Sequence, residues 1–265
     1  MDLISAALLG VLQGLTEFLP VSSTAHLLLG EQILGFKDSA GAFTVIIQFG
    51  SILALIWVYR TKLFEVLRGL PSKPESRRFV LMLAIACLPA LGAGAFLGSR
   101  VKGLYGYPSL IAAAFILGGI VMLAVEQNRP APVVFSADRT PLGRALAVGA
   151  FQMLALIPGV SRSGATIIGG LILRVERSAA AELSFFLAMP TLTAACLHDA
   201  WEIRHDLGSA QALEIGVGMV MAFVAAAAVV RPFLRYVSRS GFAPFAWYRI
   251  AAGIAILGAV AMGWL

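Results

Sequence analysis

The sequence predicts an all-α integral membrane protein with six transmembrane helices and two re-entrant helical hairpins in an inverted-topology repeat. Three observations predict this fold: the 265 residues are 59% hydrophobic, only 13% of them are charged, and the mean hydropathy is +0.88. Soluble domains carry about 25% charged residues, and one membrane crossing needs about 17 to 25 apolar residues. The composition therefore excludes a soluble enzyme and a nucleic-acid binder. We expect a single membrane domain over residues 1–265, with repeat halves 1–126 and 142–265.

Six apolar segments are each long enough to cross the membrane once. They are residues 43–59, 79–98, 109–126, 181–200, 213–230 and 245–265. We expect no charged side chain in the interior of any of them. Two further apolar segments, 3–29 and 142–173, are interrupted near their middles by proline and by clusters of serine. Because proline breaks helices and each half is too short to cross alone, we expect both segments to form re-entrant hairpins. Irregular backbone at membrane depth must be buried by protein or hydrated by a cavity.

The net charge is +6, which in a soluble protein would indicate a nucleic-acid partner. In a membrane protein an excess of Lys and Arg instead reflects orientation, because short cytoplasmic loops collect these residues. We therefore expect no nucleic-acid partner. With the six predicted spans, fourteen of the twenty basic residues fall on one side of the membrane: Arg60, Lys62, Arg68, Lys73, Arg77, Arg78, Arg129, Arg139, Arg144, Arg174, Arg177, Arg231, Arg235 and Arg239. This distribution requires the two hairpins to enter from opposite faces.

A short internal similarity agrees with opposite entry. Residues 10–24 resemble residues 149–161 with a one-residue offset, each running from a Gly and a Gln to a Pro and a Ser. Weak internal similarity between two segments of opposite orientation is typical of inverted-topology repeats. Cys87 and Cys196 both lie in apolar runs, where we expect small core residues rather than a disulfide or a metal site.

Ionisable groups at membrane depth are functional candidates, and the broken hairpins contain Glu17, His26 and Arg162. Gln13 and Glu17 are four residues apart, so they share one helix face and offer two side-chain oxygens to a divalent cation. The alternative is that Glu17 merely pairs with Arg162.

Three hydroxyl residues, Ser22, Ser23 and Thr24, follow Pro20 at a predicted helix N-terminus, where backbone N–H groups and the helix dipole attract an anion. Ser23 and His26 are three residues apart, a spacing that suits a nucleophile beside an acid/base group. Ordinary N-capping is the alternative explanation of the serines.

The second break combines glycines with hydroxyls and an arginine. Ser161, Ser163 and Thr166 can donate to oxygen atoms, and the guanidinium of Arg162 matches a phosphate. The two breaks would thus each offer hydrogen-bond donors to an anion. If they converge from opposite faces of the membrane, they would surround one anionic group, which predicts a lipid ligand with a phosphate-like headgroup. The pattern leaves both hydrolysis and transport open.

The two motifs resemble a known family. Residues 13–26, QGLTEFLPVSSTAH, and residues 158–166, PGVSRSGAT, are similar to the two signature segments of bacterial undecaprenyl-diphosphate phosphatases of the bacitracin-resistance type. The similarity extends along the whole chain and includes residues 47–53, IQFGSIL, which contain Gln48.

The resemblance implies a multi-pass enzyme of the bacterial inner membrane. Such an enzyme removes the terminal phosphate of undecaprenyl diphosphate at the outer face, recycles the lipid carrier of cell-wall synthesis and uses a divalent metal, Mg or Ca. By motif position, the implied catalytic residues are Glu17, Ser23, His26 and Arg162, and the implied metal ligands are Glu17 and Gln13. Those implied for substrate binding are Ser22, Thr24, Gln48, Ser161, Ser163 and Thr166.

The chain departs from the family pattern at two positions. Gln13 stands where some members have glutamate, and Ala25 replaces a glycine that often precedes the histidine. An amide cannot act as a general base, but its neutral oxygen can still bind a metal, so we expect weaker metal affinity rather than lost turnover.

Three alternatives remain open at this point. A flippase or transporter of polyprenyl phosphate would use the same architecture without needing a nucleophile. The loop with His198, Asp199, Glu202, His205 and Asp206 could hold a metal, although such loops are more often solvated. Gly216, Gly218 and Gly253 permit close helix packing within one chain or in a homodimer. The expected partners are membrane lipids and a polyprenyl diphosphate substrate.

Overall fold

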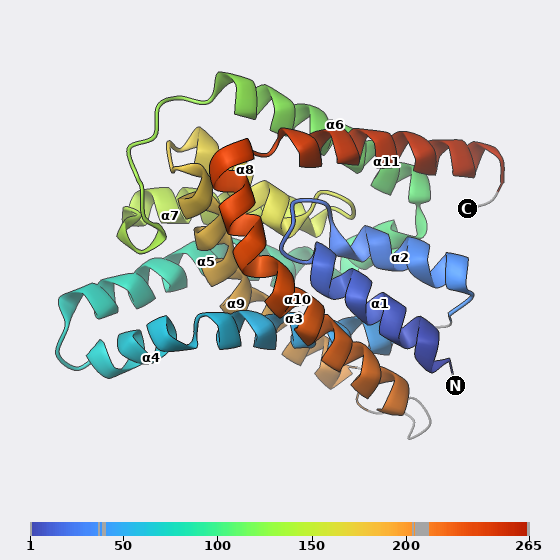
Figure 1. Cartoon of the computed structure of the whole chain (residues 1–265), viewed down its shortest axis with the longest axis horizontal. Helices are drawn as coiled ribbons and strands as arrows, with labels where there is room; N and C mark the ends of the chain where they lie inside the picture. The colour runs from blue at the N-terminus through green and yellow to red at the C-terminus, as the bar shows by residue number, and fades with distance from the viewer. Residues whose placement is uncertain (1, 37, 39–40, 203, 205–211, 264–265) are drawn as a thin grey trace. The chain divides into compact units, whose positions relative to one another are not determined.

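The computed structural model describes residues 2–36, 38, 41–202, 204 and 212–263, which form eleven α-helices (Figure 1). These are α1 (Leu3–Thr16), α2 (Ser23–Leu34), α3 (Ala42–Val58), α4 (Arg60–Gly69), α5 (Pro74–Lys102), α6 (Pro108–Asn128), α7 (Leu142–Gln152), α8 (Arg162–Ile172), α9 (Arg177–Glu202), α10 (Ala212–Ser240) and α11 (Ala243–Ala261). Short 3-10 turns are η2 (Gly103–Gly106), η3 (Ala137–Arg139) and η4 (Met153–Leu156). Within the described ranges no strand forms, so the all-α prediction is confirmed.

Each of the six predicted spans coincides with a helix. Five helices, α5, α6, α9, α10 and α11, are long and apolar enough to cross a bilayer. The sixth candidate is the pair α3 and α4, which bends by 69°. Large apolar side chains lie on the outside of these helices, for example Phe96 at 83% and Leu117 at 62% exposure. Such a surface is costly in water and is typical of helices that face lipid.

The two interrupted segments form helix–break–helix structures, as predicted. α1 and α2 are separated by residues 17–22, and α7 and α8 by η4 and residues 157–161. α1, the longest of these four helices, has 14 residues and at 1.5 Å per residue extends about 21 Å, less than the roughly 30 Å of a hydrocarbon core. Asp2 caps α1, and its hydrogen bonds from the Ser5 hydroxyl and backbone N–H lower the pKa of its carboxyl group.

The chain divides into two compact units. Unit 1 comprises Met1–Phe18, Ser23–Glu65 and Ala188–Phe233, and unit 2 comprises Leu19–Ser22, Val66–Leu187 and Leu234–Leu265. Each unit combines three separate segments drawn from both halves of the chain, so the units differ from the predicted repeat halves. The boundaries of those halves therefore stay a prediction.

Unit 1 is built around a core shared by α1, α2, α3 and α10. The buried side chains of this core are Ala6, Leu9, Leu27, Phe43, Ile47, Ile215 and Ala222. Glycines let the backbones approach closely. A Cβ on Gly10 would overlap the carbonyl oxygen of Gly218, and a Cβ on Gly50 would overlap that of Met219. Small residues at helix contacts are the usual means of close packing in membranes, where burial of apolar surface provides little driving force.

Unit 2 contains two closely packed helix pairs. α6 and α11 lie side by side, as Figure 1 shows, and α5 packs on α7. α8 packs on both α6 and α7. Gly149 on α7 faces the carbonyl of Ala86 on α5, and Gly119 on α6 faces the carbonyl of Ala246 on α11. These contacts fix the backbone that surrounds the second break.

Two of the three glycines linked to helix packing act within the chain. Gly218 lies against Phe43 and Ile47, and Gly253 lies against Ala112 and Ile116. A Cβ on Gly216 would have no atom within 4 Å. Close packing inside the protein therefore accounts for Gly218 and Gly253, and a homodimer stays a prediction.

We expect Gly149→Ala to destabilise the protein, because the added methyl group meets backbone and α5 and α7 must separate. Overpacking of this kind costs about 1–3 kcal/mol. Gly143→Ala is the matched control, since it lies on the same helix in open space and alanine is the better helix former. Thermal unfolding in detergent checks the prediction, and equal unfolding temperatures for the two variants would contradict it.

Candidate active site

The first break, residues 17–22, begins where α1 ends at Thr16. Pro20 has no N–H to continue the helix. Ser22 has a φ of 68°, a left-handed conformation that is uncommon outside glycine. α2 starts at the next residue, Ser23. Strained backbone of this kind is concentrated at functional sites.

A buried polar cluster lies in unit 1 beside this break. The Nε2 amide of Gln13 donates to Oε2 of Glu17 at 2.9 Å, and the hydroxyl of Ser23 donates to the same oxygen at 2.6 Å. Gln13, Glu17 and Ser23 are 1%, 5% and 8% exposed. The prediction that Gln13 and Glu17 share one helix face is confirmed. The carboxylate is placed to accept a proton from Ser23, as a base does for a hydroxyl nucleophile.

The hydroxyl of Ser23 thus pairs with Glu17, whereas the sequence spacing had pointed to His26. Every polar contact described for Ser23 is with Glu17. Thr24 and His26 lie in the first turn of α2 and are half-buried, and Ser22 is buried. The pairing of Ser23 with Glu17 was missed because the five residues between them form the break, whose path no helical spacing describes.

The second break, in unit 2, has the same backbone feature as the first. Ser161 has a φ of 74° and directly precedes α8, as Ser22 directly precedes α2. Its hydroxyl caps α8 by accepting from the N–H of Gly164 at 3.1 Å. Gly159 has a φ of 89°, and a Cβ there would lie 2.7 Å from the carbonyl oxygen of Ile111. The predicted similarity between the two motifs therefore extends to backbone conformation.

Unit 2 also contains the turn of the first break. The hydroxyl of Ser163 donates to the carbonyl oxygen of Leu19 at 2.7 Å, and it lies 3.0 Å from the hydroxyl of Ser161. Residues Leu19–Ser22 belong to this unit. The turns of the two signature motifs therefore meet, although 144 residues separate Leu19 from Ser163.

Arg162 is oriented by a residue that the sequence analysis did not identify. Its Nη1 donates to the carbonyl oxygen of Ser184 at 3.0 Å and to the Ser184 hydroxyl at 3.2 Å. The hydroxyl of Thr166 lies 2.7 Å from that of Ser184. Ser184 is fully buried on α9. Nothing in the sequence marked it, because it is one serine in an apolar span outside both motifs.

Arg249 is the second residue that the sequence analysis missed. The segment 245–265 was expected to carry no interior charge, but Arg249 lies on α11 and is 1% exposed. That expectation was wrong, since a charged side chain can enter an apolar span where backbone oxygens surround it. An arginine inside a predicted span was itself a sufficient signal of a functional residue.

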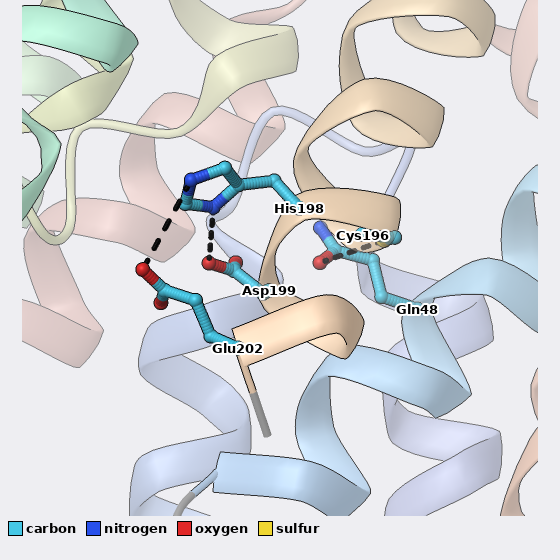
Figure 2. A network of polar contacts seen from close by, with 5 residues as sticks. All are labelled: Gln48, Cys196, His198, Asp199 and Glu202. Atoms are coloured by element: carbon cyan, nitrogen blue, oxygen red, sulfur yellow. Dashed lines mark hydrogen bonds and ion pairs between the residues drawn. The ribbon is translucent and has the colours of Figure 1, made fainter. Parts of the chain in front are cut away.

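Gln48 lies on α3 in unit 1, where it contacts Cys196. Figure 2 shows the pair on neighbouring helices, with the Sγ of Cys196 3.8 Å from Oε1 of Gln48. Gln48 is half-buried. The contact places Gln48 beside α9, and the role of Gln48 in substrate binding stays a prediction.

Three residues that the sequence analysis assigned to an acidic loop, His198, Asp199 and Glu202, lie close together on the last turns of helix α9 (Figure 2). His198 Nδ1 is 3.5 Å from Asp199 and its Nε2 is 4.0 Å from Glu202, and its side chain is 69% exposed. Their potential ligand atoms lie within 4.8 Å of one another. Exposed groups of this kind form ordinary surface ion pairs, which agrees with the expected solvation although these residues are helical, and a metal here stays a prediction. His205 and Asp206 lie outside the described residues.

The donor set around Glu17 suits a hard divalent cation. Its carboxylate, the amide oxygen of Gln13 and the hydroxyl of Ser23 are all oxygen ligands, which Mg²⁺ and Ca²⁺ prefer. In the present arrangement the Gln13 amide turns its nitrogen toward Glu17. Rotation of the amide group would bring its oxygen to the same side, so the residues fit such an ion.

We expect Ser184→Ala to weaken anion binding at Arg162, because the guanidinium loses a buried hydrogen-bond partner. One such bond contributes about 1 kcal/mol, or roughly a fivefold change in affinity. Ser178→Ala on the same helix is the control, because its hydroxyl pairs with Glu176. Titration with inorganic pyrophosphate measures the effect. Equal affinity for both variants would show that Ser184 does not orient Arg162.

Comparison with known proteins agrees with both motifs. Residues 6–255 match the family described as "Bacitracin resistance protein BacA". The chain is 47% identical to an "Undecaprenyl-diphosphatase" of Paracoccus denitrificans, over 98% of both chains. It is 48% identical to proteins of the same name from Cereibacter sphaeroides, over 98% of this chain and 97% of that one, and from Methylococcus capsulatus, over 97% and 94%. With a match of this extent and two motifs whose turns meet, the chain belongs to the BacA family of bacitracin resistance proteins.

Proposed function

We propose that this protein is an integral membrane phosphatase that hydrolyses undecaprenyl diphosphate to undecaprenyl phosphate and inorganic phosphate. The observation that carries the proposal is the 2.6 Å hydrogen bond from the Ser23 hydroxyl to the buried Glu17 carboxylate. A flippase needs an anion cradle but no hydroxyl activated by a base. The names of relatives that match nearly the whole chain support the same substrate.

In this reaction Glu17 accepts the proton as an oxygen nucleophile attacks the terminal phosphorus. The nucleophile is either the Ser23 hydroxyl or a water molecule held by it. The bond between the terminal phosphorus and the bridging oxygen breaks, and undecaprenyl phosphate leaves. If Ser23 attacks, water then cleaves the phosphoserine and releases inorganic phosphate. His26, on the helix that begins with Ser23, is the candidate acid for the leaving oxygen.

Arg162 and the hydroxyls of the second break provide the electrostatic part of catalysis. Phosphoryl transfer depends mainly on positioning and on stabilisation of charge at the non-bridging oxygens. Arg162 would bind these oxygens. Ser161, Ser163 and Thr166 belong to the proposed substrate-binding set, and their described hydrogen bonds to protein atoms hold their hydroxyl groups in place. Ser22, Thr24 and Gln48 complete the proposed substrate-binding set.

A divalent cation, Mg²⁺ or Ca²⁺, would be held by Glu17 and Gln13 and would neutralise phosphate charge when bound. The cellular location follows from the substrate. We place the protein in the bacterial inner membrane with its active site facing the periplasm or cell exterior, where it would recycle the carrier lipid of cell-wall synthesis. Its expected partners are this lipid and the surrounding membrane lipids.

The test is phosphate release from undecaprenyl diphosphate by the purified protein in detergent, with added Mg²⁺ or Ca²⁺ and with a chelator. We expect metal-dependent release that falls at least 100-fold in Glu17→Ala and in Arg162→Ala, the order of magnitude of losing one key electrostatic group. Glu65→Ala and Arg231→Ala change exposed residues outside both motifs and serve as controls.

Absence of release by folded wild-type protein would reject the phosphatase and favour the flippase. Ser23→Ala separates the two nucleophiles. Turnover within tenfold of the wild type would identify water as the nucleophile. A larger loss in this variant, together with a phosphoserine trapped in the wild type, would identify Ser23.

We further expect Gln13→Glu to lower the metal concentration needed for half-maximal turnover about tenfold, because a second carboxylate binds a divalent cation more tightly than an amide does. The maximal rate should change less than this concentration. Gln127→Glu, at an exposed position of α6, controls for the added charge. An unchanged metal dependence would mean that Gln13 is not a ligand.

A further inference from the structure

Arg249 lies inside unit 2, on α11, and is 1% exposed. It is the largest of the fully buried side chains. An ionised guanidinium removed from water is costly unless its donors are satisfied. Its surroundings therefore show what stabilises it.

All five N–H donors of the guanidinium are used. Its donors reach five backbone carbonyl oxygens: Nε to Phe115 at 3.4 Å, Nη1 to Pro20 at 3.2 Å and Val160 at 2.9 Å, and Nη2 to Ala114 at 3.0 Å and Gly159 at 2.9 Å. Arginine has five such donors in one rigid plane. With all of them committed to backbone, none remains to bind a substrate phosphate.

Three of the five acceptors belong to the two breaks. Pro20 lies in the turn of the first motif, and Gly159 and Val160 lie in the turn of the second. Carbonyl groups in such turns lie outside the helical hydrogen-bond ladder, and at membrane depth they need a donor from the protein. Arg249 supplies donors to both turns at once.

The neighbouring helix is shaped to admit this side chain. A Cβ on Gly118 of α6 would collide with the Nη2 group of Arg249. The ring of Phe115 lies 5.2 Å from the guanidinium carbon, within the range of a cation–π contact. Every contact described for Arg249 is with a carbonyl oxygen or this ring, and none is with a carboxylate. The geometry is therefore that of a clamp on the backbone rather than of an ion pair.

We propose that Arg249 is a positioning residue that clamps the turns of both signature motifs together. Pro20 is three residues before Ser23, and Val160 is two residues before Arg162. The clamp therefore holds the two chain segments that lead directly into the proposed nucleophile and the proposed phosphate-binding arginine. This inference rests on the proposed function, and Arg249 acts through these segments without touching the substrate.

The test compares Arg249→Lys and Arg249→Met with the wild type, measuring kcat and KM per folded molecule after gel filtration. Lysine keeps the charge but offers three donors, which cannot reach five carbonyl groups. We expect kcat to fall at least tenfold in Arg249→Lys and at least 100-fold in Arg249→Met. Arg177→Lys is the matched control, because Arg177 pairs with Glu126 away from both breaks, and it should keep the wild-type kcat.

Hydrogen–deuterium exchange supplies a readout that does not depend on activity. In Arg249→Met we expect peptides covering residues 17–24 and 157–164 to exchange at least tenfold faster, with residues 46–55 of α3 unchanged. Unchanged exchange at both breaks would overturn the proposal. A wild-type kcat per folded molecule in Arg249→Lys would also overturn it, because the positive charge alone would then be sufficient. A wild type that releases no phosphate would reject the enzyme, while the exchange measurement would still decide whether Arg249 clamps the turns.

Discussion

The need to pair every backbone polar group at membrane depth governs this structure. Inside the helices the pairing is automatic, but at the two breaks it is not. Side chains therefore replace the missing ladder: Ser161 accepts from the N–H of Gly164, Ser163 donates to the carbonyl of Leu19, and Arg249 donates to carbonyls of both breaks. A hydrated loop in a soluble enzyme could obtain these bonds from water. Here the bonds come from side chains of the second motif and of α11.

The breaks explain why helical segments of this kind can offer a site for the proposed chemistry. A continuous helix has no free N–H groups or carbonyls in its middle, so it cannot offer a cradle to an anion there. Ending α1 at Thr16 and starting α2 at Ser23 exposes a helix N-terminus within a hairpin, and the same happens where α8 begins at Arg162. The left-handed conformations of Ser22 and Ser161 are part of the cost. Hydrogen bonds from Gln13 and Ser23 offset the cost of burying the Glu17 carboxylate.

Glycine contacts supply the rigidity that such a site needs. Lipid offers helices little reason to associate, so close backbone approach has to provide the packing energy. Gly10 and Gly50 bring α1 and α3 against α10 in unit 1, and Gly149 and Gly119 do the same for the helix pairs of unit 2. Because these contacts meet backbone rather than flexible side chains, the helices have little freedom to slide. The helices that flank the breaks are therefore closely packed within each unit.

The sequence by itself determined the helical fold, the positions of the long apolar helices and the two breaks, because helix length and helix-breaking residues are local properties. It also placed Gln13 and Glu17 on one face, since helical spacing alone decides that. Only the tertiary structure decided which residues serve the site from a distance. Ser184 is 22 residues from Arg162, and Arg249 is 229 residues from Pro20. No sequence periodicity or motif indicates either pairing, because each depends on how separate helices pack. The hydrogen bond of Ser23 to Glu17 depends likewise on the path of an irregular turn.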